Sequence, residues 1–176
     1  MTIAPQSHEI LEFPKIRAQL ARYTAFAVSR DLAQRLLPSI DSYEVRRRLN
    51  LTAEARRLLD DSPDVSIGGA RDIRGPVGLA RRGGVCEAAA FLEIAATLAS
   101  SRRLRTTLLK LDATIFPLLR ELAVDLPVLP AIEEAIARII GDDGQVLDSA
   151  SPKLGRLRVD IRGAFCPLQV KLQSMI

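Results

Sequence analysis

Two groups of closely spaced arginines are the residues best suited to binding chemistry in this sequence. They are Arg102, Arg103, Arg105, Arg156, Arg158 and Arg162. A guanidinium group carries a permanent charge and paired N–H donors, which suit a nucleic-acid phosphate. We favour the alternative that these arginines are solvated or pair with nearby acids such as Asp160, because exposed charge is normally plain surface.

Aromatic support for base stacking is weak, since aromatic residues make up 4% of the chain. Phe91, Phe116 and Phe165 lie among apolar neighbours in the sequence and are predicted to belong to the core.

Three acids near residue 145 suggest a site for a hard cation, because carboxylate oxygens suit Mg²⁺ or Ca²⁺. They are Asp142, Asp143 and Asp148. Their spacing matches no known metal-binding loop. We interpret them instead as a glycine-flanked turn in which Asp148 helps to cap the next helix.

The residues of common catalytic centres are missing. His8 is the one histidine, and the sequence has no phosphate loop, His-Glu-x-x-His or Gly-x-Ser-x-Gly motif. Cys86 and Cys166 form no Cys-x-x-Cys pair and are expected to be buried. The sequence therefore predicts no catalytic, cofactor-binding or metal-binding residue.

Composition indicates a folded protein. The chain has 176 residues, of which 48% are hydrophobic and 26% charged, and this balance excludes a disordered tail. No apolar run approaches a membrane span and residues 1–8 do not resemble a signal peptide, so we expect a cytoplasmic protein with no membrane partner. The net charge of +4 permits a nucleic-acid or ribosomal partner.

Helical periodicity dominates the first 61 residues. One helix is predicted to begin at Pro14, and a second apolar stripe covers 28–36, with Thr24 available to cap it. These two helices can also run together. Asp41 with Glu44 three residues later predicts a capping box for a third helix, which ends near residue 61.

The middle of the chain alternates turns and helices. Residues 62–84 hold six of the ten glycines, which predicts turns and at most a short helix after Asp72, and they lack the preceding strand of a phosphate-binding loop. A long helix is predicted over 86–110, and a helix with one buried face over 128–140.

A final helix is predicted from Ser151 as N-cap and Pro152 as first residue, after a short extended stretch at 145–148. Its apolar residues repeat at spacings of 3 and 4, as in the seam of a long packed helix. Because Pro167 cannot donate a helical hydrogen bond, we predict a kink or an end at 163–167. The seam is unfinished where the sequence stops.

Three segments together resemble the beginning of the second bacterial MutS family, the Smr-bearing relatives of the mismatch-repair ATPase MutS. They are Leu-Glu-Phe-Pro-Lys-Ile at 11–16, Gly-Gly-Ala-Arg-Asp-Ile at 68–73, and Asp-Gly-Gln-Val-Leu-Asp-Ser-Ala-Ser-Pro-Lys-Leu at 143–154. The third segment is the most specific.

The resemblance implies an all-α protein: a multi-helix core domain over 1–150, at most one short extended segment, and the beginning of a truncated lever helix over 151–176. It places an ATPase that uses ATP and Mg²⁺, a nucleic-acid clamp and an Smr endonuclease domain further along a homodimeric protein. Gly155, Gly163 and Pro167 depart from the uninterrupted charged rod of family members.

Our leading hypothesis is a non-catalytic scaffold that couples the downstream ATPase to the clamp. By resemblance, the whole protein binds branched DNA, in mismatch repair and suppression of recombination, or stalled ribosomes, in ribosome rescue. The alternative is a free-standing basic helical module that binds DNA or RNA. A small helical enzyme is a third hypothesis, supported by no motif.

Overall fold

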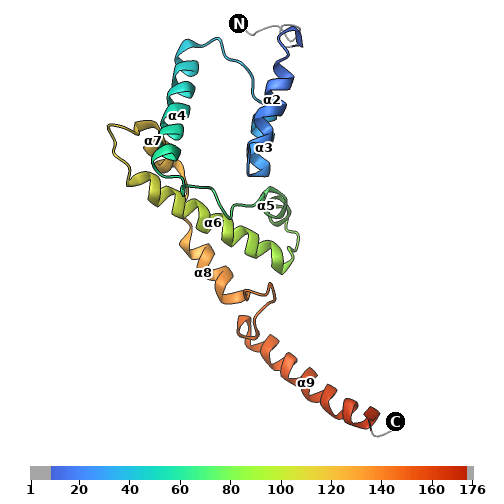
Figure 1. Ribbon diagram of the computed structural model, residues 1–176. Coiled ribbons are helices and arrows are strands. Elements are labelled where there is room, and N and C mark those ends of the chain that lie inside the picture. The colour runs from blue at the N-terminus through green and yellow to red at the C-terminus, as the bar shows by residue number, and fades with distance from the viewer. Residues whose placement is uncertain (1–8, 174–176) are drawn as a thin grey trace. The chain divides into compact units, whose positions relative to one another are not determined.

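The computed structural model describes residues 9–173, with side chains over 9–163, and it is all-α as predicted (Figure 1). Within that range no strand is present. The helices are α2 (Phe13–Arg22), α3 (Ala27–Gln34), α4 (Ser42–Asp61), α5 (Arg74–Arg81), α6 (Ala88–Leu109), α7 (Pro117–Asp125), α8 (Pro130–Ile139), the 3₁₀ turn η1 (Asp148–Ala150) and α9 (Pro152–Gln173).

The chain forms two compact units. One comprises Met1–Gly75 with Ala96–Val128, and the other comprises Pro76–Ala95 with Leu129–Ile176. The domain boundary expected at residue 150 stays a prediction.

In the first unit, α2 and α3 pack against each other as two separate helices. The small side chains of Ala21 and Ala33 are buried, which lets the two backbones approach closely. The predicted cap at Thr24 is wrong, because its hydroxyl donates to the carbonyl of Ala21 at 2.8 Å and so closes the end of α2. The N-cap of α3 is Phe26, which makes no side-chain capping bond.

Helix α4 begins where its capping signal predicts. Asp41 Oδ1 accepts the backbone N–H groups of Tyr43 at 2.9 Å and Glu44 at 3.3 Å. The second interaction of the capping box, from Glu44 back to the backbone N–H of Asp41, is made through another side chain. The N–H of Asp41 donates to the Ser39 hydroxyl, which in turn donates to the Glu44 carboxylate, so Ser39 relays the bond that Glu44 makes directly in a standard box.

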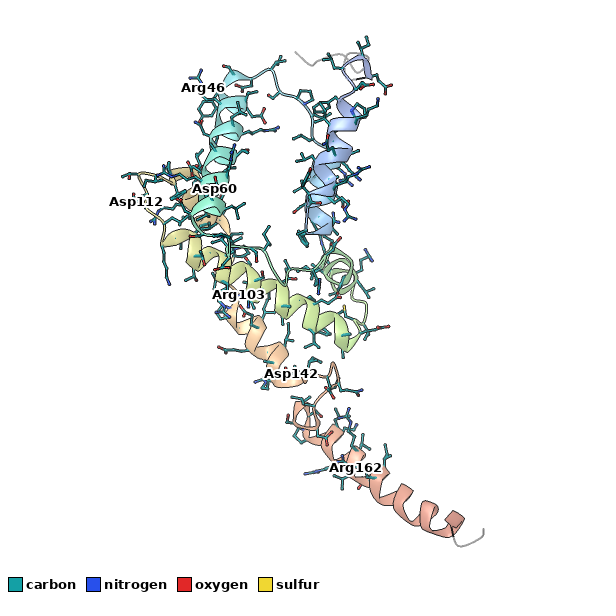
Figure 2. All side chains as sticks on the ribbon, in the orientation of Figure 1. Arg46, Asp60, Arg103, Asp112, Asp142 and Arg162 are labelled. Atoms are coloured by element: carbon teal, nitrogen blue, oxygen red, sulfur yellow. The ribbon has the colours of Figure 1, made fainter. Side chains whose placement is uncertain are left out.

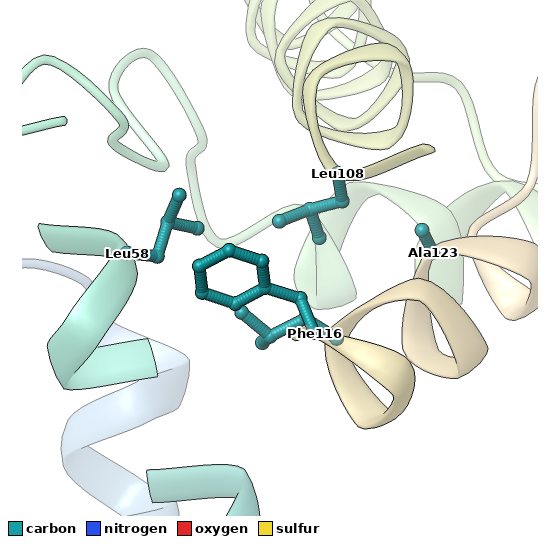
Figure 3. Packing of buried hydrophobic residues seen from close by; sticks show 5 residues of the cluster. Leu58, Leu108, Phe116 and Ala123 are labelled. Carbon is teal, nitrogen blue, oxygen red and sulfur yellow. The ribbon is translucent and has the colours of Figure 1, made fainter. Parts of the chain in front are cut away.

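The core of the first unit lies where α4, α6 and α7 meet (Figure 3). Its buried side chains are Leu58, Leu108, Phe116, Leu119 and Ala123. The prediction that Phe116 belongs to the core is confirmed. On one side of its ring the guanidinium of Arg57 lies 5.8 Å from the ring centre, within the range of a cation–π contact.

Side chains from neighbouring helices cap the helix ends around this core. Pro117 supplies no N–H at the first turn of α7, and Glu54 on α4 accepts the next two, from Leu118 at 3.2 Å and Leu119 at 2.9 Å. Arg120 on α7 in turn donates to the carbonyls of Leu109 and Leu111 at the end of α6.

A third such bond joins the last turns of α6 to the end of α7. Arg105 on α6 donates to the carbonyl of Leu126 at the end of α7, at 2.9 Å. Helices α6 and α7 therefore satisfy each other's terminal carbonyls, and α4 satisfies the start of α7.

An ion pair in this unit joins α3 to the start of α5. The guanidinium of Arg74 lies 2.7 Å from a carboxylate oxygen of Asp31 and also binds Asp72. Hydrogen bonds from the side chain and backbone of Arg74 lower the pKa of Asp72 to about 2, so this pair stays charged at neutral pH. The short helix predicted after Asp72 is confirmed as α5.

In the second unit, α8 is followed by a tight turn and an isolated antiparallel bridge between Ile140 and Val146. Of the extended stretch expected at 145–148, Val146 forms this bridge and Leu147 is extended, whereas Asp148 already begins η1. Ile136 and Ile140 are buried, whereas Ile132 is 45% exposed, so the buried face of this segment is narrower than its apolar stripe predicts.

Helix α9 starts as predicted, with the Ser151 hydroxyl accepting the N–H of Leu154 at 3.2 Å. The predicted end at 163–167 is wrong, because the helix continues through Pro167 to Gln173. The alternative of a kink there stays a prediction.

None of the helices that the structure describes has the length and hydropathy of a membrane span. Cys86 is half-buried, less than expected, and its thiol donates to the carbonyl of Pro76 at 3.4 Å. The side chains of Phe165 and Cys166 lie outside the described residues.

The capping of α7 by Glu54 gives a first testable prediction. Replacing Glu54 with alanine leaves two N–H groups of α7 without their acceptor and should lower the free energy of unfolding by about 1–2 kcal/mol. Glu54→Gln should lose less, because its amide oxygen still accepts a bond. Thermal and urea unfolding of the chain measure the difference.

Asp60→Ala is the matched control, since Asp60 lies on the same helix, is 72% exposed, and is 3.9 Å from its partner Arg56. Its effect should stay within about 0.5 kcal/mol. Equal losses from the Glu54 and Asp60 variants would contradict the capping role.

Candidate nucleic-acid interface

The arginines singled out on α6 bind the chain itself. Arg103 is exposed and donates to the carbonyl of Gly68 at 3.3 Å, and half-buried Arg105 donates to Leu126. Arg102 is exposed on the same helix. Figure 2 shows Arg103 near the middle of α6. Two of these three arginines therefore hold loops and helix ends in place, and their contact with phosphate stays a prediction.

Arg103 belongs to a row on α6 that fixes the glycine-containing segment 68–73. The buried Ser100 hydroxyl donates to the carbonyl of Gly68 at 2.8 Å, and Thr97 Oγ1 accepts the N–H of Arg71 at 2.9 Å. These residues recur every three positions, which places them along one side of the helix.

The same segment does not form a phosphate-binding loop, because backbone N–H groups that could bind a phosphate are bonded within the chain. The N–H of Gly68 donates to Ser66 Oγ, that of Ala70 to the carbonyl of Ile67, and that of Arg71 to Thr97. A nucleotide-binding loop instead aims such N–H groups at the phosphate. The residues present do not fit ATP here.

The arginines of α9 converge on one carboxylate. Asp148 lies on η1 and accepts from Arg158 and, at 3.2 Å, from Arg162, whereas Arg156 is exposed. Arg158 also donates to the carbonyl of Val146 at 2.7 Å, so it binds both the bridge and the 3₁₀ turn. The interpretation that these arginines pair with acids is confirmed for two of them, but their partner is Asp148 rather than Asp160.

The hydrogen bonds to Arg158 and then to Arg162 lower the pKa of Asp148. The acid therefore stays ionised well below neutral pH and holds both arginines at the root of α9. The predicted role of Asp148 as a helix cap is wrong, because Ser151 caps α9 and Asp148 binds side chains two and three turns further along.

The remaining acids form a turn, as favoured. Asp143 accepts the N–H of Gln145 at 3.0 Å, and Gly141 and Gln145 pair through their backbones at 2.8 Å. Among the described residues, no group of three or more His, Cys, Asp or Glu side chains is placed to hold a metal ion.

Sequence reasoning missed a basic, partly aromatic face at the start of α4. Tyr43, Arg46, Arg47 and Asn50 line one pocket with Leu118 and Glu121 of α7. The run of three arginines at 46–48, three residues after an aromatic, was the available signal. The three arginines point in different directions around the helix, so the sequence run alone does not show which of them share a face.

No family model matches the chain. The chain is similar to proteins named Endonuclease MutS2: 34% identical over 99% of the chain to that of Thermomicrobium roseum, and 39% identical over 95% to that of Geobacillus thermodenitrificans. The protein of that name from Synechocystis sp. is 33% identical over the whole chain. The chain spans about a fifth of the length of these relatives, 21–22%.

The cluster on Asp148 can be tested by NMR titration of its carboxyl carbon. Replacing Arg158 with glutamine should raise the pKa of Asp148 toward its ordinary value, because the strongest bond to the charged form is lost. Arg162→Gln should raise it less. Since the folded pKa is depressed, the stability that Asp148 contributes is present above its unfolded pKa and is lost as pH falls through the folded pKa.

Arg156→Gln is the control, because it removes the same charge from the same helix without touching Asp148 in the described structure. A pKa of Asp148 that responds equally to all three substitutions would show general charge screening in place of the cluster.

Proposed function

The chain belongs to the MutS2 family, as its three motif segments predict, and we propose that it acts there as a non-catalytic helical scaffold. In this proposal the chain joins an ATPase located elsewhere in the protein to a clamp that holds nucleic acid. The name of its relatives, which describes an endonuclease, supports a role in the handling of nucleic acid.

One observation carries the proposal: directional hydrogen bonds and ion pairs attach the first turns of α9, its root, to the segment at 146–148. Arg158 and Arg162 bind Asp148, Arg158 binds the carbonyl of Val146, and η1 packs against both α8 and α9. A rigid joint of this kind transmits a rotation, whereas a flexible linker absorbs it.

The side chains further along α9 support a role in contact with other parts of the protein. Leu157 and Ile161, two residues of the predicted seam, are 49% and 55% exposed. A seam of this spacing normally packs against another helix. We propose that a helix from the rest of the protein covers it.

The other parts of the proposal concern the whole protein. We propose that ATP and Mg²⁺ bind outside this chain, since its glycine segment does not fit a nucleotide, and that the protein is a homodimer. Branched DNA and stalled ribosomes are the two proposed partners, through mismatch repair and suppression of recombination or through ribosome rescue.

The test uses the intact protein that contains this segment. Asp148→Asn should leave the basal rate of ATP hydrolysis unchanged and reduce its stimulation by branched DNA or ribosomes severalfold, because the joint that carries movement to the clamp is loosened. Steady-state ATPase assays with and without each partner measure this, and Arg156→Gln is the control expected to behave like the parent.

Two results would overturn the proposal. One is hydrolysis of ATP by the purified 176-residue chain at a rate that survives a contaminant control. The other is full stimulation of the ATPase in Asp148→Asn when NMR shows that the cluster with Arg158 is broken.

A further inference from the structure

A polar pocket lies between the first half of α4 and helix α7. Its lining residues are Tyr43, Arg46, Arg47, Asn50, Leu118 and Glu121, and its volume is about 230 Å³. Figure 2 shows Arg46 near the start of α4, well away from the labelled Asp60 at its other end. Pockets for drug-sized ligands usually enclose about 300–1,000 Å³. This one therefore suits a smaller group, such as one base or one phosphate.

The four lining residues of α4 share one face because they are spaced three and four apart. They include an aromatic ring, two guanidinium groups and a carboxamide. Tyr43 is 76% exposed, so its ring is available for contact and adds little to the core. Such a ring beside arginines is the usual platform for an unpaired base.

The two arginines of the pocket differ in their pairing. Arg47 pairs with Glu121 at 2.9 Å, and Arg48, which faces away from the pocket, pairs with Glu44. No ion pair of Arg46 is found among the described residues. The pocket thus holds one neutralised arginine and one arginine whose charge is available to an anion.

We propose that this pocket is a subsite for one nucleotide of single-stranded nucleic acid, with Arg46 on the phosphate and Tyr43 stacked on the base. Asn50 supplies an amide to the edge of that base. The inference goes beyond the scaffold role, which needs no nucleic-acid contact within this chain, and it rests on the proposed function only in that the intact protein handles nucleic acid. A base inside a duplex cannot stack on Tyr43, because both of its faces are covered.

The experiment measures binding of a fluorescently labelled oligodeoxythymidylate to the 176-residue chain by anisotropy over a salt series. Tyr43→Ala should weaken binding at least about fivefold, the lower range for loss of one base–aromatic stack, and Tyr43→Phe should keep most of the affinity. Arg46→Gln should lower the slope of log affinity against log salt by about 0.7, the value for one phosphate of a single strand.

Glu121→Gln tests the charge balance directly. It removes the acid that occupies Arg47 and should strengthen binding, whereas loss of an ordinary surface ion pair would leave binding unchanged. Arg56→Gln is the matched control, because Arg56 lies on the same helix, is 84% exposed and does not line the pocket. It should change the affinity by less than about twofold and leave the slope of log affinity against log salt unchanged.

Three results would overturn the inference: no binding of the oligonucleotide at low salt, equal losses from Arg46→Gln and Arg56→Gln, or tighter binding of a duplex of the same length. Unchanged thermal unfolding of each variant establishes that the fold is intact. Failure here leaves the scaffold proposal standing, because that proposal is measured by ATPase coupling in the intact protein.

Discussion

The first unit depends on helix ends that are satisfied by side chains from other helices. Every helix leaves unpaired N–H groups at its start and carbonyls at its end. The start of α7 relies on Glu54 of α4, and the ends of α6 and α7 rely on Arg120 and Arg105 from each other. The core they enclose is small, and no large side chain in the described structure is fully buried. Directional bonds at the helix ends therefore fix an arrangement that apolar packing alone would leave loose.

The second unit uses the same device with different residues. Asp148 and the carbonyl of Val146 hold Arg158, so the root of α9 is attached to the turn before it through charge and backbone at once. This explains why arginines that suit phosphates by type are largely occupied with the protein itself. Among the three consecutive arginines at 46–48, pairing with Glu121 and Glu44 leaves Arg46 as the one that best meets an external anion.

Local signals in the sequence predicted most of the helices and few of the bonds between them. Asp41 and Ser151 act within one turn of their own position, so the starts of α4 and α9 follow directly from residue type. The bond from Glu54 to α7 crosses 64 residues of sequence and has no local signature. The bond between Arg158 and Asp148 lacks a local signature for the same reason. Asp160, the example of a nearby acid named from the sequence, lies two residues from Arg158 and so on a different side of the helix, whereas the turn brings Asp148 close.

Two of the three segments that carry the family resemblance, 68–73 and 143–154, contain connections between helices, and backbone geometry gives a reason. Gly69 has φ of +91° and Gly144 has φ of +76°, conformations that other residues adopt only with strain. Side chains at fixed places then hold each connection: Ser100 and Thr97 hold the first, and Arg158 holds the second. A helix face tolerates many apolar residues of similar size, but a connection of this kind requires a particular glycine and a particular donor. Short motifs at these joints therefore identify the fold more specifically than the longer helices do.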